Sequence, residues 1–359
     1  MLKIDAEVLS IVIICTNLHH QTTRMLKKIL FTPLLLLSLF SCEPDPLDVD
    51  TSSIELEIKA KRMEQELFQP ESTNINATHS QLLEKYGALY QLFFENMLGE
   101  GSVHDPMASS YLEKFIGNKD MQNFYLEINS KFHDFSAYES EITDAFKHYK
   151  YYFPDSTIPE IVTFYSNFNA NAFPLGNRLG IGLDMYLGAE NEIVKSIPTS
   201  SLPQFIKDKM DSKFLVADGV KYWLFNRFFE EDNHDFLAEI ISSGKIMYLM
   251  DAILPNKSDA IKIGYTEAEL NWCERSEVNI WEILINEELL YSKDQKKIAQ
   301  FTANGPFTKG LPEESPSMIG VWIGWQMVRD YAEDTGASVL DLLAETNYRK
   351  ILKSYDPNE

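Results

Sequence analysis

The feature that most constrains this chain is the stretch from Gly305 to Gly336, GPFTKGLPEESPSMIGVWIGWQMVRDYAEDTG, in which a loop leads into an aromatic helix. Glycine and proline interrupt its first half too often for a helix or a central strand. Ser315 then stands where an N-cap is favoured, Pro316 suits the first helical position, and the final glycine ends the helix. Trp322 and Trp325 recur among other apolar residues at helical spacing. This stripe predicts a face that is buried in a core.

The segment from Met25 to Cys42, MLKKILFTPLLLLSLFSC, has two lysines, an apolar run and a small residue before a cysteine. This pattern is typical of a secretory signal, and the run is too short to span a bilayer. Leu39 to Cys42 also resembles the lipobox of bacterial lipoproteins, which implies cleavage before Cys42 and acylation of its thiol and new amino group. A plain secretory signal with an incidental cysteine is the alternative. We therefore expect removal of residues 1–41, an upstream extension plus signal peptide, and an acidic tether at residues 42–52.

Charge and cysteine content exclude two classes of protein. The formal charge is −22, from 32 basic against 54 acidic residues, so the chain should repel nucleic acid phosphates and anionic lipid headgroups. Of the three cysteines, Cys15 precedes the expected cleavage point and Cys42 is the expected acylation site. Cys273 alone remains, which excludes a disulfide framework.

Hydrophobic periodicity predicts an α+β fold that is predominantly helical with a small β-sheet. We expect a single globular domain over residues 53–359. Its N-terminal half is helical at about residues 80–152, and its C-terminal half combines strands and helices at about residues 158–359.

Two segments are predicted to be strands: Ile54 to Ile58 alternates with charged residues, and Ile161 to Tyr165 is rich in β-branched and aromatic residues. Leu179 to Leu183 contains two glycines that would let two strands or a helix approach closely. Helices are predicted at residues 80–98, 107–152, 218–229 and 235–250, and the second range should break at Gly117 and near Phe135. Two more helices should begin at the capping box of Thr266 and Glu269 and at Ser338.

The sequence lacks an evident metal site. Zinc hydrolases place two imidazoles one helical turn apart with a carboxylate between them, and no HExxH occurs. No two histidines after Cys42 share a turn, and surface histidines are the simpler interpretation of His79, His104, His133, His148 and His234. We therefore expect neither a metal nor a cofactor.

Other candidate catalytic patterns are equally weak. Ser242 and Lys245 form an SxxK pair without its companion motifs, so a polar helix edge is favoured over a nucleophile. Cys273 falls on an apolar helix face, which favours a buried structural thiol. Carboxylate pairs such as Glu230–Glu231 and Glu287–Glu288 cannot be interpreted in so acidic a chain, because a glycosidase pair is defined by its separation in space.

Several separated segments follow the lipoprotein signal and span nearly the whole mature chain. They are SSIELEIKAKRMEQELF, GIGLDMYLG, SGKIMYLMDAILP, IGYTEAELNWC, IWEILINEELLYS, GPFTKGLPEESPSMIGVWIGWQMVRDYAED and ILKSYDP. In sequence and in order, these segments resemble the gliding-motility lipoprotein B family of Bacteroidetes.

This resemblance implies an envelope lipoprotein needed for movement over surfaces, with other motility proteins as partners and no established catalytic step. Where the family is expected to have Glu-Gly-Lys, this chain has Ser243, Gly244 and Lys245. The layout also resembles a zinc-peptidase, or zincin-like, scaffold, in which a glutamate from a second helix completes the metal site. Because that glutamate and the histidine pair are missing, at most the fold is shared.

The first functional hypothesis is a non-catalytic component of the gliding apparatus, anchored through Cys42 to the inner or outer membrane with its globular part in the periplasm. The alternative is a hydrolase of zinc-peptidase or glycosidase type at the cell envelope. A glycan-binding lipoprotein is a third hypothesis, and it would need exposed aromatic platforms. Under the first hypothesis, partner contact is expected at the loop residues Gly305, Pro306, Phe307, Thr308, Lys309 and Gly310.

Overall fold

The computed structural model describes residues 46–69, 74–99, 101–229 and 235–357. Cys42 and the signal segment lie outside these ranges. Internal contacts separate Val49–Glu359, which holds the sheet and the helices, from the residues before it. Within the described ranges, no helix is long and apolar enough to cross a membrane.

A small sheet has the strand order β1-β2-β4-β3. Strands β1, β2 and β4 are parallel, β3 is antiparallel to β4, and Val162 of β2 is aligned with Gly180 of β4. A two-residue turn joins β3 to β4, and Gly176 supplies its positive φ of 61°. The bounds are β1 (Lys61–Arg62), β2 (Glu160–Phe164), β3 (Ala172–Leu175) and β4 (Arg178–Gly182).

The structure confirms the strand predicted at Ile161 to Tyr165, corrects the one at Ile54 to Ile58, and places β4 in the glycine-containing segment. Ile54 to Ile58 is not a strand, because its extended chain bonds to side chains of a helix: the Ile58 N–H donates to Thr143 Oγ1 at 3.0 Å and the Ala60 N–H to Glu139 at 2.9 Å. Strand β3 was not predicted, since its short run contains a proline. The close approach expected at the glycines is confirmed, because a Cβ on Gly182 would lie 2.2 Å from a backbone oxygen.

The N-terminal helices follow the predicted region with one local difference. Gly87, with φ 52°, divides the predicted 80–98 helix. In the helix over residues 119–132, Tyr125 is buried and Leu126 is 60% exposed. The elements are α2 (Met63–Phe68), α3 (Ile75–Tyr86), α4 (Ala88–Leu92), the π-helix η2 (Phe93–Met97), α5 (Ala108–Gly117), α6 (Lys119–Phe132) and α7 (Ser136–Tyr152).

The C-terminal half contains the longest helices. The predicted capping box of Thr266 and Glu269 opens α13, and Asp235 caps α11. The elements are η3 (Leu183–Tyr186), α8 (Glu192–Ser196), α9 (Gln204–Lys207), η4 (Ser212–Phe214), α10 (Leu215–Phe228), α11 (Phe236–Ile253), α12 (Asp259–Ile263), α13 (Glu267–Asn286), α14 (Gln295–Thr302), α15 (Ile319–Thr335), α16 (Val339–Ala344) and α17 (Tyr348–Ser354).

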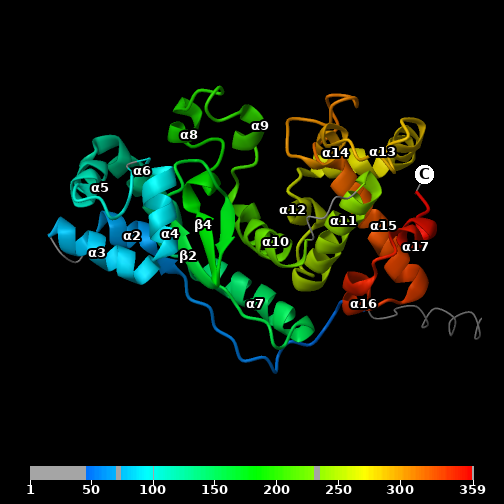
Figure 1. The fold of residues 1–359 in the computed structure, drawn as a ribbon, viewed down its shortest axis with the longest axis horizontal. Helices are drawn as coiled ribbons and strands as arrows, with labels where there is room; N and C mark the ends of the chain where they lie inside the picture. The colour runs from blue at the N-terminus through cyan, green and yellow to red at the C-terminus, as the bar shows by residue number, and fades with distance from the viewer. Residues whose placement is uncertain (1–45, 70–73, 100, 230–234, 358–359) are drawn as a thin grey trace, which may run out of the picture. The chain divides into compact units, whose positions relative to one another are not determined.

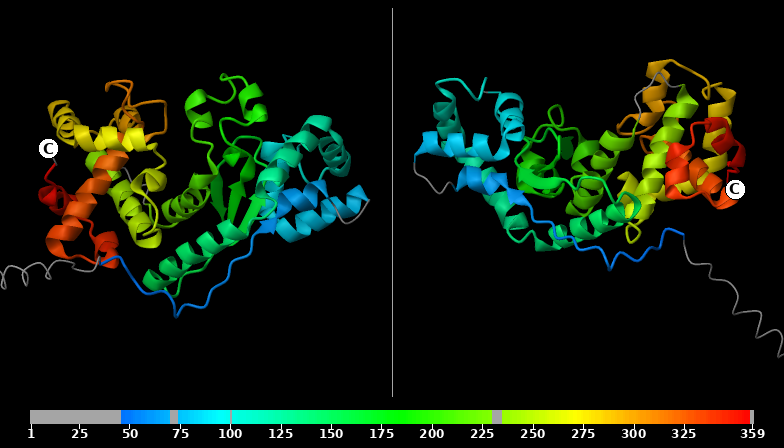
Figure 2. Two further views of the ribbon diagram at one scale, coloured as in Figure 1. Left: turned by 180° about the vertical axis from the view of Figure 1, so that it is seen from behind. Right: turned by 60° about the horizontal axis from the view of Figure 1, so that its bottom comes forward.

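Helix α11 is the centre of this half and is buried on all sides, as expected for a helix that is apolar all round. It packs most extensively against α15, and α12, α14, α16 and α17 also contact it (Figures 1 and 2). Gly244 and Gly324 make the crossing possible, since a Cβ on Gly244 would lie 2.1 Å from the Gly324 carbonyl oxygen. The predicted predominantly helical α+β class is confirmed.

Helix α15 starts later than the sequence predicted. Met318, with φ 58°, stands at its N-cap, so the N-cap prediction for Ser315 was wrong. The reason is tertiary: Thr308 donates both its N–H and its hydroxyl to the Pro316 carbonyl oxygen, which keeps these residues in the loop. The predicted end at Gly336 is confirmed.

Candidate functional site

A cavity of about 1000 Å³ lies between strand β3 and helices α10, α11 and α15, and we call it the central cavity. Its walls come from segments far apart in the sequence. The segments that flank the predicted loop contribute Thr302 and Asn304 before it and Met318 and Val321 after it. Ligand pockets have volumes of roughly 300–1000 Å³, so the central cavity is large enough for a sizeable ligand.

One face of α10 forms a wall that is partly aromatic. Asp218, Tyr222, Phe225 and Phe229 recur at three- and four-residue intervals and all line the cavity. The opposite face, with Trp223, is buried in the core. The rings of Phe225 and Phe229 lie 5.5 Å apart between centroids. Helical spacing thus directs aromatic side chains into the cavity as well as into the core.

The carboxylate of Asp218 is fully engaged by its neighbours. Its Oδ2 accepts hydrogen bonds from Asn171 Nδ2 at 3.2 Å and from the Tyr186 hydroxyl at 3.1 Å. Its Oδ1 lies 3.2 Å from Lys221 Nζ, which also donates to the Ile263 carbonyl oxygen. Burial and this carboxylate raise the pKa of Tyr186 well above its usual value. The group is therefore an internally satisfied cluster.

A second cation at the cavity is also paired. Lys209 Nζ lies 3.4 Å from Glu269 Oε1 and 5.3 Å from the centre of the Tyr265 ring. The other oxygen of Glu269 accepts the Thr266 N–H in the capping box of α13. One glutamate thus both caps a helix and positions a cavity lysine.

The turn before β3 is held by a buried acid. Asp184 accepts hydrogen bonds from the Ser166 N–H at 2.8 Å, the Ser166 hydroxyl at 2.9 Å and the Phe168 N–H at 2.6 Å. Burial raises the pKa of Asp184 to about 6, although these hydrogen bonds oppose the rise. Asn167 and Phe168 have φ angles of 56° and 57°, which non-glycine residues rarely adopt. Asp184 therefore stabilises a strained turn that places Phe168 in the cavity wall.

Across the cavity, α11 and the start of α15 form the opposite wall. Ser243 and Met247 lie one turn apart on α11, and Met318 adjoins them with its left-handed φ of 58°. Met318 and Phe168 are two of the four non-glycine residues with positive φ in the described ranges. Backbone strain concentrates at functional sites, so its presence on two walls marks this cavity as a candidate site.

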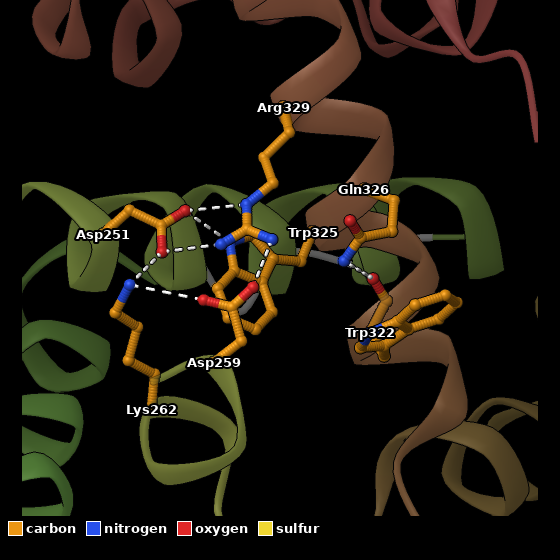
Figure 3. A network of polar contacts seen from close by, with 7 residues as sticks. All are labelled: Asp251, Asp259, Lys262, Trp322, Trp325, Gln326 and Arg329. Atoms are coloured by element: carbon orange, nitrogen blue, oxygen red, sulfur yellow. Dashed lines mark hydrogen bonds and ion pairs between the residues drawn. The ribbon is translucent and has the colours of Figure 1, made fainter. Parts of the chain in front are cut away.

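A buried ionic network joins α11 to α15 and α12 (Figure 3). Asp251 accepts hydrogen bonds from Arg329 Nε and Nη2, each at 2.9 Å, from Trp325 Nε1 at 2.8 Å, and from Lys262 Nζ at 2.8 Å. Arg329 Nη1 also donates to Asp259 at 2.6 Å, and its guanidinium lies 4.0 Å from the centre of the Trp325 ring. Two acids and two bases balance in charge, so no member is left as an unpaired charge, and Arg329 and Asp259 are part-exposed.

The pKa values of two members follow from this geometry. Burial alone would raise the pKa of Asp259, but the hydrogen bond and charge of Arg329 bring it below its usual value. Burial alone would lower the pKa of Arg329, and Asp259 and Asp251 raise it instead. Asp259 and Arg329 therefore keep their charges at neutral pH, which makes their contact a structural connection and not a proton donor or acceptor.

A family model described as gliding motility protein GldB matches residues 44–357. The chain belongs to this family. No curated protein and no solved structure matches the chain. The family resemblance drawn from separated sequence segments is confirmed, and the resemblance to a zinc-peptidase scaffold stays a prediction.

Segments that carry the GldB resemblance meet at the cavity and at the network. The segment SGKIMYLMDAILP supplies Ser243 and Met247 to the cavity and Asp251 to the network. The segment that begins at residue 305 supplies Met318 to the cavity and Arg329 to the network. These two features thus share the same helices, α11 and α15.

The loop predicted for partner contact in this GldB family member is fixed to the domain, and one of its residues is inaccessible. Thr308 is fully buried, and its hydroxyl donates to the Pro316 carbonyl oxygen at 2.7 Å, so its side chain cannot meet a partner directly. The exposed loop residues are Pro306, Lys309 and Gly310, and the half-buried ones are Gly305 and Phe307.

The SxxK pair has structural contacts. Ser242 donates a hydrogen bond to the Tyr348 hydroxyl at 3.2 Å, and Lys245 Nζ donates to the Glu345 carbonyl oxygen. Both contacts connect α11 to the C-terminal segment. Ser243, at the position where the family's acid is expected, is the member of this run that lines the cavity.

The thiol and imidazole candidates do not form a site. Cys273 is fully buried, and burial raises the pKa of its thiol far above the usual range, so it is a poor nucleophile. The prediction of surface histidines was wrong at His79 and His148, which are both buried. His79 bonds to the Tyr90 hydroxyl and the Val103 carbonyl oxygen. Across the described residues, no group of three or more His, Cys, Asp or Glu side chains is placed to bind a metal ion. His234 and the pair Glu230–Glu231 lie outside those residues.

Sequence reasoning missed the cavity and the Asp251–Arg329 pair. A signal for the pair was present, because Asp251 is an acid within an apolar run and both residues lie in family segments. The expected burial of Trp322 and Trp325 is confirmed at 2% and 0% exposure. The hydrogen bond from Trp325 to Asp251 gave no sequence signal.

Proposed function

We propose that the mature protein is a membrane-anchored lipoprotein of the gliding machinery that holds a partner protein and catalyses no reaction. The observation that carries this proposal is the family match over residues 44–357. Support for a non-catalytic role comes from the cavity, where Asp218, Lys221 and Lys209 are each paired within the protein. A general acid or base would instead need a group available to the substrate.

The anchor in this proposal is Cys42, acylated after cleavage, with the globular part in the periplasm. The chain is fixed to α7 by Ile58 and Ala60, and Lys59 Nζ adds a contact of 3.0 Å to Glu139. Between Cys42 and Ile58 a fully extended chain reaches at most about 55 Å, at about 3.4 Å per residue. The tether would therefore keep the domain close to its membrane.

The proposed contact surface is the exposed part of the loop, at Pro306, Lys309 and Gly310. A surface that binds a partner loses less conformational entropy when it is already ordered. The hydrogen bond of Thr308 to Pro316 and that of Gln300 Nε2 to the Lys309 carbonyl oxygen provide this order.

Deletion of the gene in its own bacterium tests the motility role. A deletion strain should fail to spread over a surface and should spread again when the wild-type chain is restored. Normal spreading of the deletion strain would contradict the proposal.

Metal analysis of the purified protein tests whether the protein binds zinc, and stoichiometric zinc would favour the hydrolase.

A labelled fatty acid tests the anchor separately. The wild-type chain should incorporate the label, and a Cys42→Ala variant should not. Equal labelling of the two chains would show that Cys42 is not the attachment site.

A further inference from the structure

We propose that the central cavity binds an uncharged peptide segment of the partner protein, rich in apolar side chains. This inference rests on the proposed function and names the chemistry of the partner. It follows from the cavity's walls, its charges and its position at the edge of the sheet.

The walls favour apolar side chains. Tyr222 is 42% exposed and Phe225 and Phe229 are part-exposed, all on the cavity face of α10. Two methionines, Met247 and Met318, line the opposite wall. Methionine adapts to irregular shapes and is frequent on surfaces that bind apolar peptides. Aromatic and methionine walls therefore predict a ligand with apolar side chains.

The charges favour an uncharged ligand. Asp218 is paired with Lys221, Lys209 is paired with Glu269, and Glu239 also interacts within the protein. A charged ligand group would lose its hydration without gaining an available counter-charge from the described residues of the walls, which is costly. The net charge of −22 opposes an acidic ligand further.

The edge of the sheet favours a peptide. Strand β3 ends the sheet, and the Gly182 N–H donates to the Asn171 carbonyl oxygen. In an antiparallel pair, residues that bond to the partner strand alternate with residues that do not. Because Asn171 bonds to β4, the carbonyl groups of Ala172 and Pro174 and the N–H of Ala172 point away from β4. Ala172 is buried, and Pro174 lines the cavity but lacks an N–H, so at these two residues the edge offers a bound peptide only the Pro174 carbonyl oxygen. Side-chain contacts would supply most of the affinity.

An oligosaccharide fits the same walls less well. The exposed ring of Tyr222 and the amides of Asn169 and Asn226 line the cavity and could contact a sugar. The rings of Phe168, Phe225 and Phe229 carry no hydrogen-bonding group, and sugar hydroxyls buried against them would lack a partner, which costs free energy. Apolar side chains cover these rings without that cost, so a peptide is the ligand that we propose.

Selection from a library of short random peptides tests the proposal. The mature chain carrying Cys42→Ser, which cannot be acylated there, is used to select peptides, and their dissociation constants are measured. Selected peptides should be uncharged and rich in apolar residues. Tyr222→Ala and Phe225→Ala should each weaken binding by about tenfold or more. Leu126→Ala, at a side chain that is 60% exposed and outside the cavity, should leave binding unchanged.

Tyr222 is exposed enough to be truncated with little effect on stability, and unfolding curves confirm that each variant is folded.

Three results would overturn the proposal: no peptide is selected, the selected peptides are mainly charged, or neither cavity variant weakens binding. Binding of chito-oligosaccharide that depends on Tyr222 would also overturn it in favour of a glycan. If peptides fail to bind while the deletion strain fails to spread, this inference is wrong and the proposed function stands. Peptide binding combined with normal spreading would support the cavity as a peptide site and contradict the motility role.

Discussion

Arg329 on α15 binds both carboxylate oxygens of Asp251 on α11, at 2.9 Å each, although 78 positions separate the two residues. The pair is bidentate, which adds geometric specificity to the charge interaction. It fixes the crossing of the two helices that form one wall of the central cavity. The network around Asp251 is thus a structural support of the candidate site.

Removing one partner of this network should destabilise the fold strongly. Asp251→Ala leaves only the part-exposed Asp259 to pair with Arg329 and Lys262 and removes the acceptor of Trp325 Nε1. Loss of a buried partner costs up to about 3–5 kcal/mol. Urea unfolding measures the free energy of unfolding. Glu113→Ala, at an exposed acid on α5, is the control and should change it by less than about 0.5 kcal/mol. Similar effects of the two substitutions would contradict a structural role for the network.

The crossing of α11 and α15 should not tolerate a methyl group. Gly244→Ala places a Cβ against the backbone of Gly324, and such overpacking costs about 1–3 kcal/mol or more. Gly117→Ala is a matched control, because a Cβ there meets no atom within 4 Å. That control should be neutral or slightly stabilising, by up to about 1 kcal/mol. Equal melting temperatures for the two variants would show that the helices can separate at little cost.

Asp184 should give stability a specific pH dependence. Its folded pKa is raised to about 6 from 3.8, so the folded protein holds the proton more tightly than the unfolded chain. Stability should therefore decrease as the pH rises from about 4 to about 6, by up to about 3 kcal/mol for this group. Asp184→Asn cannot titrate, so the difference in unfolding free energy between wild type and variant should change across that window as the wild-type carboxyl titrates. A constant difference would contradict the raised pKa.

The exposed loop should matter for motility without affecting the fold. Lys309→Glu reverses a charge at an exposed position, so it should impair spreading while the protein level stays normal. Lys119→Glu makes the same charge change at an exposed position on α6 and should leave spreading unchanged. Spreading assays and immunoblots measure the two quantities. Normal spreading of the Lys309 variant would exclude its side chain from the proposed contact.

The sequence predicted helix ends correctly where the residues that cap the helix lie close to the end in the sequence. The capping box at Thr266 and the glycine at Gly336 are two such cases, because the groups that satisfy the helix end lie within a few residues. The start of α15 could not be predicted this way. Thr308 fixes Pro316 through the folded loop, and the helix begins at Ile319 as a result.

The candidate site could not be predicted because it is formed by tertiary contacts. Phe168 and Val321 line one cavity, and no periodicity relates positions so far apart. At Ile54 to Ile58 a local pattern was present but no strand formed. Apolar and charged residues alternate there, yet only Ile58 is buried. Hydrogen bonds to α7 side chains replace a strand partner there.

The central claim is that the chain acts in gliding while tethered to a membrane through Cys42. Surface spreading of the deletion strain, complemented with either wild type or Cys42→Ala at matched protein level, tests it most directly. Wild type should restore spreading and the Cys42→Ala variant should not. Equal spreading of the two complemented strains, or normal spreading without the chain, would contradict the claim.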